Sequence, residues 1–445
     1  MNIYIETLGC PKNFNDSEML AGILKKHDNI IVEEPEKADV AVVNTCGFIN
    51  DAKVESIDTI LSMAKLKKSN KELILVVSGC LSQRYIEELY QEMPEVDILL
   101  GVNDYNSLPG LLDKLDRKRN KEKEECRIKL KNSLPDTFYD YRSRMPLENR
   151  YSRTVKIAEG CDNVCAYCVI PEIRGKFRSR KMEDIEKEAM KLAEEGCVEL
   201  ILIAQDVTNY GSDIYGKPML PELLKRLSEI EEIHWIRLMY CYEDRVTDEL
   251  IKVMKNEPKV CNYIDMPIQH ISDNILENMR RRSTGDSIKK TIDRLRSGIP
   301  DIHIRTTFIT GFPGETENDF DELYDFVSLM KLDRLGVFAY SKEENTPAGD
   351  MENQIEENVK AQRRDSIMRR QLEISLEYNL QKVGKTFEVL VEGVDEEGVY
   401  YGRTEYDAPA IDNSVIFTGN DLKPGDFVRV KIVDAYDYDL IGVME

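Results

Sequence analysis

The sequence predicts an α/β protein of several domains: an N-terminal parallel α/β sheet domain, a central incomplete (βα)6 barrel of the TIM type and a C-terminal all-β barrel of the OB type. Three observations support this. The chain has 445 residues, too many for one core, so two to four domains are expected. Short apolar runs alternate with amphipathic stretches, as in parallel sheets covered by helices. Beyond Gly384 the pattern changes to short strands between turn residues.

The N-terminal region contains four apolar runs that predict the strands of a parallel sheet, separated by helical patterns such as 17–26 and 55–65. The runs are residues 3–5, 40–43, 73–77 and 98–100. Each of the first three is followed within a few residues by a cysteine: Cys10, Cys46 and Cys80. Because the carboxyl ends of parallel strands lie along one edge, these cysteines can converge. From the residues alone they are either ligands of a cluster or buried thiols.

The stretch 118–146 is predicted to be a linker, because it follows a charged run, is polar and contains Pro135 and Pro146. The alternative is a basic patch, against which the interleaved acids argue. Cys126 is interpreted as incidental.

A second α/β series begins near Thr154 and predicts six strands. They are residues 154–158, 200–204, 235–239, 263–266, 302–309 and 335–339, with helical patterns such as 182–195, 273–296 and 317–331 between them. Six such units fit an incomplete (βα) barrel with its active site at the carboxyl ends of the strands.

The C-terminal region predicts one long charged helix, 356–381, and then a small β-barrel of about 60 residues. Its expected strands are residues 387–391, 399–401, 415–417 and 427–433. From Gly384 onward fourteen acidic residues stand against five basic ones, a balance of −9. We expect this barrel and the neighbouring sheet to form an acidic cleft over the active site.

The whole chain is also acidic, with a net charge of −22. Such a surface repels a phosphate backbone and suits a basic partner; alternatively, the acidity only aids solubility. The N-terminus does not resemble a signal peptide and no apolar run approaches a membrane span, so we expect a cytoplasmic protein without a membrane partner.

Three cysteines in CxxxCxxC spacing, Cys161, Cys165 and Cys168, follow the first strand of the central region. Soft thiolate ligands select iron–sulfur clusters or zinc. A structural zinc site needs a fourth nearby ligand, but the next histidine is His234. The spacing therefore indicates a 4Fe-4S cluster with one open iron.

With the aromatic Tyr167 before its last cysteine, this segment resembles the radical-SAM superfamily, and nearly the whole chain is similar to the methylthiotransferase family. The resemblance implies a second 4Fe-4S cluster on Cys10, Cys46 and Cys80, S-adenosyl-L-methionine as radical source and methyl donor, and a C-terminal TRAM barrel. It implies an N-terminal domain at 1–117, a linker at 118–146, a radical-SAM core at 147–377 and a TRAM domain at 378–445.

Within that family, four segments resemble the branch that methylthiolates the β-carbon of an aspartate in small-subunit ribosomal protein twelve. They are residues 7–13, 205–207, 267–272 and 305–316. The acidic C-terminal barrel also suits a basic ribosomal protein and disfavours tRNA, the substrate of the other branch. A non-catalytic iron–sulfur or RNA-binding scaffold is disfavoured because both clusters would have an open iron. An external electron donor and a sulfur source are implied.

Further candidate residues follow from position. Cofactor contacts are expected at Tyr167, Gln205, Arg305 and Gly311; the turn at Gly311 could equally be a plain tight turn. Arginines after the cysteine loop, which could hold a carboxylate or be solvated, are Arg174, Arg178 and Arg180. Structural or inert roles are expected for His234, His270, His303, Cys197, Cys241 and Cys261. No side chain is assigned a catalytic role of its own.

Overall fold

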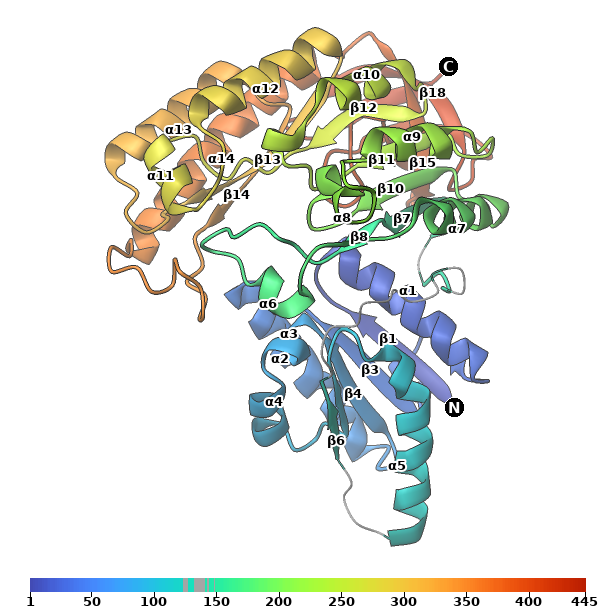
Figure 1. Ribbon diagram of the computed structural model, residues 1–445. Coiled ribbons are helices and arrows are strands. Elements are labelled where there is room, and N and C mark those ends of the chain that lie inside the picture. Colours follow the sequence, from blue (N-terminus) through green and yellow to red (C-terminus); the bar gives the residue numbers. More distant parts are fainter. Residues whose placement is uncertain (123–126, 132–140, 142–143, 148) are drawn as a thin grey trace. The chain divides into compact units, whose positions relative to one another are not determined.

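Figure 1 shows the computed structural model, which describes residues 1–122, 127–131, 141, 144–147 and 149–445. The chain divides into two compact units. The first comprises Met1–Asn149, Glu159–Asn163 and Cys168–Arg180, and the second comprises Arg150–Ala158, Val164–Tyr167 and Lys181–Glu445. Cys126 and Pro135 lie outside the described residues. Within the described part of the chain, no helix combines the length and apolarity that a membrane crossing requires.

The first unit contains a six-stranded parallel sheet in the order β2-β1-β3-β4-β5-β6. Its strands are β1 (Asn2–Thr7), β2 (Ile30–Ile31), β3 (Val40–Thr45), β4 (Ile74–Gly79), β5 (Ile98–Leu100) and β6 (Ile128–Leu130). All four predicted strands are confirmed. The sequence missed β2 and β6, which are too short to show a clear pattern.

Helices cover both faces of this sheet, because alternate strand residues point to opposite sides. Val40, Val42 and Ile74 pack with residues of α1 (Pro11–Lys26) and α5 (Leu108–Glu122). Ala41, Val43 and Leu75 pack with residues of α2 (Asn50–Lys65) and α4 (Ile86–Glu92). The remaining short helices are α3 (Cys80–Arg84), α6 (Ile170–Arg174) and the 3-10 turns Pro35–Lys37, Leu66–Lys68 and Tyr105–Ser107.

Part of the segment predicted to be a linker, 118–146, is ordered structure. It contains the end of α5 and strand β6, which pairs in parallel with β5. Ile128 and Leu130 pack against the core of the unit. Arg127 donates hydrogen bonds to the backbone carbonyls of Tyr90, Met93 and Val96 at 2.6–2.8 Å. Strand β6 is therefore held by two apolar side chains and one arginine. A pattern of so few residues is too weak to predict a strand from the sequence.

The second unit contains six parallel strands in the order β14-β13-β12-β11-β10-β7. They are β7 (Ser152–Lys156), β10 (Glu199–Ile203), β11 (Trp235–Leu238), β12 (Val260–Asp265), β13 (His303–Thr310) and β14 (Arg334–Ala339). All six predicted strands are present. Consecutive strands are neighbours and helices connect them, so the incomplete (βα) barrel is confirmed. Short strands β8 (Ala158–Glu159) and β9 (Arg178–Ser179) flank the cysteine loop in sequence.

Its helices match the sequence pattern with one exception. They are α7 (Met182–Glu194), α8 (Ser212–Tyr215), α9 (Leu220–Ser228), α10 (Asp248–Asn256), α11 (Asp273–Asn278), α12 (Gly285–Gly298), α13 (Glu317–Met330) and α14 (Glu357–Leu380), with 3-10 turns at Val207–Asn209 and Glu243–Arg245. The single helix expected over 273–296 is wrong. Arg280 has a positive φ of 57°, and Thr284 starts a new helix with a capping box.

The C-terminal strands close into a barrel in the order β15-β16-β17-β19-β18. They are β15 (Thr386–Val394), β16 (Tyr400–Arg403), β17 (Val415–Thr418), β18 (Phe427–Ala435) and β19 (Leu440–Met444). Inward-facing Val389, Val391, Val430 and Ile432 fill it. The four predicted strands are confirmed, and β19 is the one the sequence missed.

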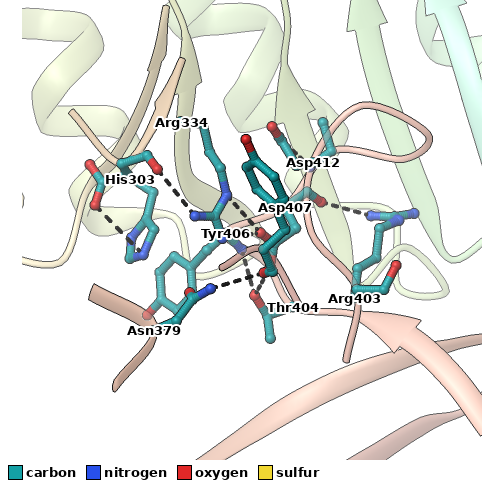
Figure 2. Close-up of polar contacts among 12 residues, drawn as sticks. His303, Arg334, Asn379, Arg403, Thr404, Tyr406, Asp407 and Asp412 are labelled. Atoms are coloured by element: carbon teal, nitrogen blue, oxygen red, sulfur yellow. Dashed lines mark hydrogen bonds and ion pairs between the residues drawn. The ribbon is translucent and has the colours of Figure 1, made fainter. Parts of the chain in front are cut away.

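The barrel packs against the amino ends of the parallel strands in its own unit. Glu199, the first residue of β10, accepts hydrogen bonds from Arg237 and from Arg403 of the barrel, each at 2.9 Å. Arg334, the first residue of β14, donates to Asp407 at 2.6 Å (Figure 2). The expected acidic cleft over the carboxyl ends is therefore wrong, because buried ion pairs hold the barrel at the opposite end.

Candidate functional site

The three N-terminal cysteines lie at the carboxyl ends of three adjacent strands. Cys10 follows β1, Cys46 directly follows β3 and Cys80 directly follows β4, and these strands are neighbours in the sheet. Cys46 and Cys80 are buried, and Cys10 is partly exposed. The structure thus brings the three thiols to one edge, as predicted from the parallel pattern.

Two glycines leave room beside these cysteines. A Cβ at Gly9 would lie 2.9 Å from Cys46 Sγ, and one at Gly79 would lie 2.3 Å from the carbonyl oxygen of Thr45. Both glycines also have positive φ values, 90° and 95°, which favour glycine. Any larger residue would push the cysteine loops apart, so the backbone holds the thiols at close quarters.

Asn13 joins the loops that carry the cysteines, and the sequence analysis did not single it out. Its Nδ2 donates to the carbonyl oxygens of Leu8 at 2.9 Å and Thr45 at 3.0 Å. Its Oδ1 accepts from Arg174 at 2.9 Å and lies 3.8 Å from Cys80 Sγ. Its sequence signals are its place at the end of segment 7–13 and its position three residues after the first cysteine, near the start of α1.

Arg174 is a charged group in contact with one of the N-terminal cysteines. Its side chain is 3% exposed, and Nη2 lies 3.3 Å from Cys80 Sγ. Nη1 pairs with Asp16 at 2.7 Å and with Glu159 at 3.5 Å. Burial raises the pKa of Cys80, and the Arg174 charge opposes that rise. Burial also raises the pKa of the Cys46 thiol to about 12, so binding soft metal here must displace the thiol protons. Arg174 is therefore buried, not solvated.

The CxxxCxxC loop is also largely buried, with Cys161 and Cys165 each 7% exposed and Cys168 partly exposed. Cys161 and Cys168 belong to the first unit and Cys165 to the second. The Cys161 backbone N–H donates to the Gly175 carbonyl oxygen at 3.0 Å. This bond fixes the entry of the loop within the first unit.

Cys165 has a tyrosine partner that sequence reasoning missed. The Tyr242 hydroxyl and Cys165 Sγ are hydrogen-bonded at 3.3 Å. The guanidinium of Arg281 lies 4.4 Å from the centre of the Tyr242 ring and pairs with Glu243. Burial raises the pKa of Tyr242, so the phenol stays neutral and can donate to sulfur. Tyr242 lies 77 residues from Cys165, a separation that no local motif bridges.

The predicted cofactor residues fall into two groups within the second unit. Gln205 follows β10 and Gly311 follows β13, so both lie at carboxyl strand ends, and Tyr167 is partly buried. Arg305 instead pairs with Asp265 at 3.0 Å and with Asp412 of the C-terminal region at 3.3 Å. Its side chain is therefore engaged with the C-terminal barrel, at the amino end of the sheet. This geometry does not support a role for Arg305 in binding the cofactor.

The turn at Gly311 is built tightly. Its N–H donates to Glu315 Oε2 at 2.6 Å, and a Cβ there would come within 2.2 Å of the Lys360 side chain. The glycine is thus required by close packing against α14. A role in binding a cofactor stays a prediction.

The remaining candidates have structural surroundings. The His270 ring is buried, which lowers its pKa to about 3, and Nδ1 accepts from the Ser272 N–H at 3.1 Å. His303 stacks on Tyr406 at 4.0 Å between ring centres, and His234 contacts Phe427 at 4.0 Å. The expected inert thiols are all buried: Cys197, Cys241 and Cys261. Arg180 stacks over Tyr141 at 4.2 Å, and Arg178 donates to the Lys176 carbonyl oxygen.

The donor set of the N-terminal edge consists of three thiols on separate loops, Cys10, Cys46 and Cys80. Thiolates are soft ligands that select iron–sulfur clusters or zinc, and among the residues that the structure describes no group of three or more His, Cys, Asp or Glu side chains is placed to hold a single metal ion. A cubane cluster needs no such group, since each thiolate binds a different iron. Three thiols on separate loops, with glycine beside them, match this requirement.

Three family models match the chain. The uncharacterized protein family UPF0004 matches residues 2–101, the radical SAM superfamily matches 155–327 and the TRAM domain matches 383–444. A radical SAM domain implies a 4Fe-4S cluster and S-adenosyl-L-methionine. The N-terminal domain suggests a second cluster.

Curated relatives match over nearly the full length. The chain is 50% identical to the ribosomal protein uS12 methylthiotransferase RimO of Clostridioides difficile, over 99% of this chain and 98% of the relative. It is 50% identical to the protein of the same name from Acetivibrio thermocellus, over 98% and 97%. Among solved structures, the radical S-adenosylmethionine methyltransferase TsrM of Kitasatospora setae has a TM-score of 0.54 at 13% identity, covering 78% of this chain and 77% of that one. That likeness supports the fold.

Proposed function

This chain belongs to the RimO family of radical SAM ribosomal protein uS12 methylthiotransferases, and from that premise we propose that it adds a methylthio group to the β-carbon of an aspartate in uS12. The observation that carries the proposal is the gathering of Cys10, Cys46 and Cys80 at one sheet edge, in a chain that also has a CxxxCxxC loop. An electron carrier normally ligates its cluster fully with protein side chains, whereas each of these triads would leave one iron open.

Each triad is proposed to hold one 4Fe-4S cluster with an open iron. Cys161, Cys165 and Cys168 would hold the radical-SAM cluster, and the strand-end cysteines would hold the second. When bound, the clusters and S-adenosyl-L-methionine supply the radical that takes a hydrogen atom from the substrate carbon and the methylthio group that replaces it. A radical is needed because an unactivated C–H bond has no acidic proton for a general base.

The chain's own residues position these groups. Asn13 ties together the loops that carry Cys10 and Cys46, and the Tyr242 hydroxyl is hydrogen-bonded to the Cys165 sulfur. Gln205 and Gly311, at the carboxyl strand ends, are the residues best placed for S-adenosyl-L-methionine in the second unit, with Tyr167 in the loop itself. The predicted boundaries, 1–117, 118–146, 147–377 and 378–445, are retained as a proposal for the functional domains.

The substrate proposal draws support from charge. Between Gly384 and Glu445 the balance is −9, and Arg403, one of the five basic residues there, is buried in its pairs with Glu199 and Glu392. The barrel surface is therefore poor in cations that could hold phosphate. Because the barrel lies at the amino strand ends, it would attract a basic ribosomal protein by steering. Such a substrate would place the enzyme in the cytoplasm, with an external electron donor and sulfur source.

The test is mass spectrometry of uS12 and of tRNA after reaction with the reduced, reconstituted protein and S-adenosyl-L-methionine. We expect a methylthio group on one uS12 aspartate and none on tRNA adenosine. The matched control replaces Cys161 with Ala, which should abolish deoxyadenosine formation as well. Methylthio-adenosine with unmodified uS12 would move the chain to the tRNA branch.

A second measurement tests the ligand sets. The variant in which Cys10, Cys46 and Cys80 are all Ala should lose about half of the bound iron while keeping some cofactor cleavage. Iron content equal to that of the unsubstituted protein would make these three residues ordinary buried thiols.

A further inference from the structure

Arg174 is a buried cation placed against a cysteine sulfur. It is the last residue of α6, and the neighbouring Ile173 packs with Val169, Val102 and Cys80 in one buried cluster. Its Nη2 donates toward Cys80 Sγ at 3.3 Å, and a guanidinium remains charged in proteins. The guanidinium is only 3% exposed. Burying a charge is costly unless opposite charges and hydrogen bonds compensate for the lost hydration.

We propose that Arg174 is a positioning residue that raises the reduction potential of the cluster held by Cys10, Cys46 and Cys80, through its charge and its hydrogen bond to the Cys80 sulfur. The inference rests on the proposed second cluster and goes beyond its ligands. Reduction adds negative charge to a cluster, and hydrogen bonds to the ligand sulfurs are among the factors that set its potential. A nearby cation therefore favours the reduced state.

Two carboxylates act in the opposite sense. Asp16 lies 2.7 Å and Glu159 3.5 Å from Arg174 Nη1, and both are nearly buried. Together they oppose the guanidinium charge, so the cluster senses a balance rather than a lone cation. Removing the cation and removing one carboxylate must then shift the potential in opposite directions.

A merely structural Arg174 makes a different prediction. The guanidinium also donates to Asn13 Oδ1 at 2.9 Å, so its loss would loosen the cysteine loops. Loosening alone gives no reason for the Asp16 and Arg174 variants to differ in sign. The direction in which the reduction potential shifts in the two variants therefore separates an electrostatic role of Arg174 from a merely structural one.

The experiment is a redox titration of the full-length chain, followed by electron paramagnetic resonance. The CxxxCxxC cysteines are replaced by Ala in every sample so that only the second cluster titrates. The variants are Arg174→Gln, Asp16→Asn and Arg127→Gln. Arg127 is the matched control, because it donates three hydrogen bonds to carbonyls in the same unit and its loss reports general loosening.

At a fixed ambient potential, the reduced-to-oxidised ratio should fall about tenfold in Arg174→Gln, which is about 59 mV for a one-electron couple. It should rise in Asp16→Asn and stay unchanged in Arg127→Gln. An unchanged potential in either of the first two variants, or shifts of the same sign in both, overturns the inference. If Arg174→Gln loses its cluster, the sign of the Asp16→Asn shift still decides. A background protein without any cluster refutes the proposed ligand set, and the inference falls with it.

Discussion

Replacing Glu199 with Gln should detach the C-terminal barrel from the parallel sheet. Glu199 is fully buried, and its carboxylate pairs with Arg237 of the sheet and Arg403 of the barrel. Glutamine keeps the shape of the side chain but leaves two buried guanidinium groups without their shared counter-charge. The substitution should therefore weaken the contact between the parallel sheet and the C-terminal barrel within the second unit.

The expected loss is about 3 kcal/mol. Burial tends to raise the Glu199 pKa, but Arg403 and Arg237 outweigh it and lower the pKa from 4.5 to about 2, which corresponds to about 3 kcal/mol at neutral pH. Breaking a buried ion pair independently costs roughly 3–5 kcal/mol. A depressed carboxyl pKa stabilises the fold above 4.5, and this contribution is lost as pH falls toward 2. At pH 3 the difference between the two proteins should shrink to about 1 kcal/mol.

Native-state hydrogen exchange measures this contact locally, since a multidomain chain has no single unfolding free energy. Backbone amides of β16 should exchange roughly 100-fold faster in Glu199→Gln at pH 7. The control is Glu388→Gln, which breaks the half-exposed pair with His234 and should cost less than about 1 kcal/mol. Equal exchange in the two variants, or an effect of Glu199→Gln that does not shrink at pH 3, would refute the reasoning.

Three further outcomes are expected. Asn13→Leu removes the hydrogen bonds to the carbonyls of Leu8 and Thr45 and should lower the stability of the N-terminal unit by about 2 kcal/mol or more. The reconstituted protein should then lose iron from the N-terminal site, as measured by iron analysis of a chain in which the CxxxCxxC cysteines are replaced by Ala. Gly79→Ala puts a Cβ 2.3 Å from the Thr45 carbonyl oxygen, so its thermal midpoint should fall, and an unchanged midpoint with full iron content contradicts the close-packing argument. Tyr242→Phe removes the hydrogen bond to Cys165 and should lower the potential of the loop cluster; a potential equal to that of the unsubstituted protein would show that the hydroxyl does not contact the ligated sulfur.

Strand periodicity made most of the fold predictable. Fourteen strands were predicted from their residues: four of the N-terminal sheet, the six parallel strands of the second unit and four of the C-terminal barrel. The missed strands β2, β6 and β9 have only two or three residues, too few to show a period, whereas β19 was missed although its five residues are apolar or glycine. The break at Arg280 was missed because a single residue with positive φ leaves the helical pattern on both sides intact.

The site was predictable only where chemistry is concentrated in cysteine. Strand-end position and spacing single out six thiols as candidate ligands, and their role as ligands stays a proposal. Asn13, Asp16 and Tyr242 were missed because their roles depend on contacts between residues 77 to 161 positions apart in the chain. For Arg305 the sequence suggested a role that the structure does not support. Its position in a strand suggested a place in the cofactor cavity, but the structure shows that the side chain pairs with Asp265 and Asp412 instead.

The segment Cys168–Arg180 has a consequence for the modularity of the protein. It belongs to the same compact unit as the N-terminal sheet although the sequence separates them. A fragment ending at Asn149 keeps all six strands of that sheet and Cys10, Cys46 and Cys80, yet it lacks Arg174 and the apolar cover that α6 gives to Cys80. Recombination with a relative at the first domain boundary would pair one parent's cysteines with the other parent's arginine. The N-terminal region is thus inherited together with a piece of chain from the next domain.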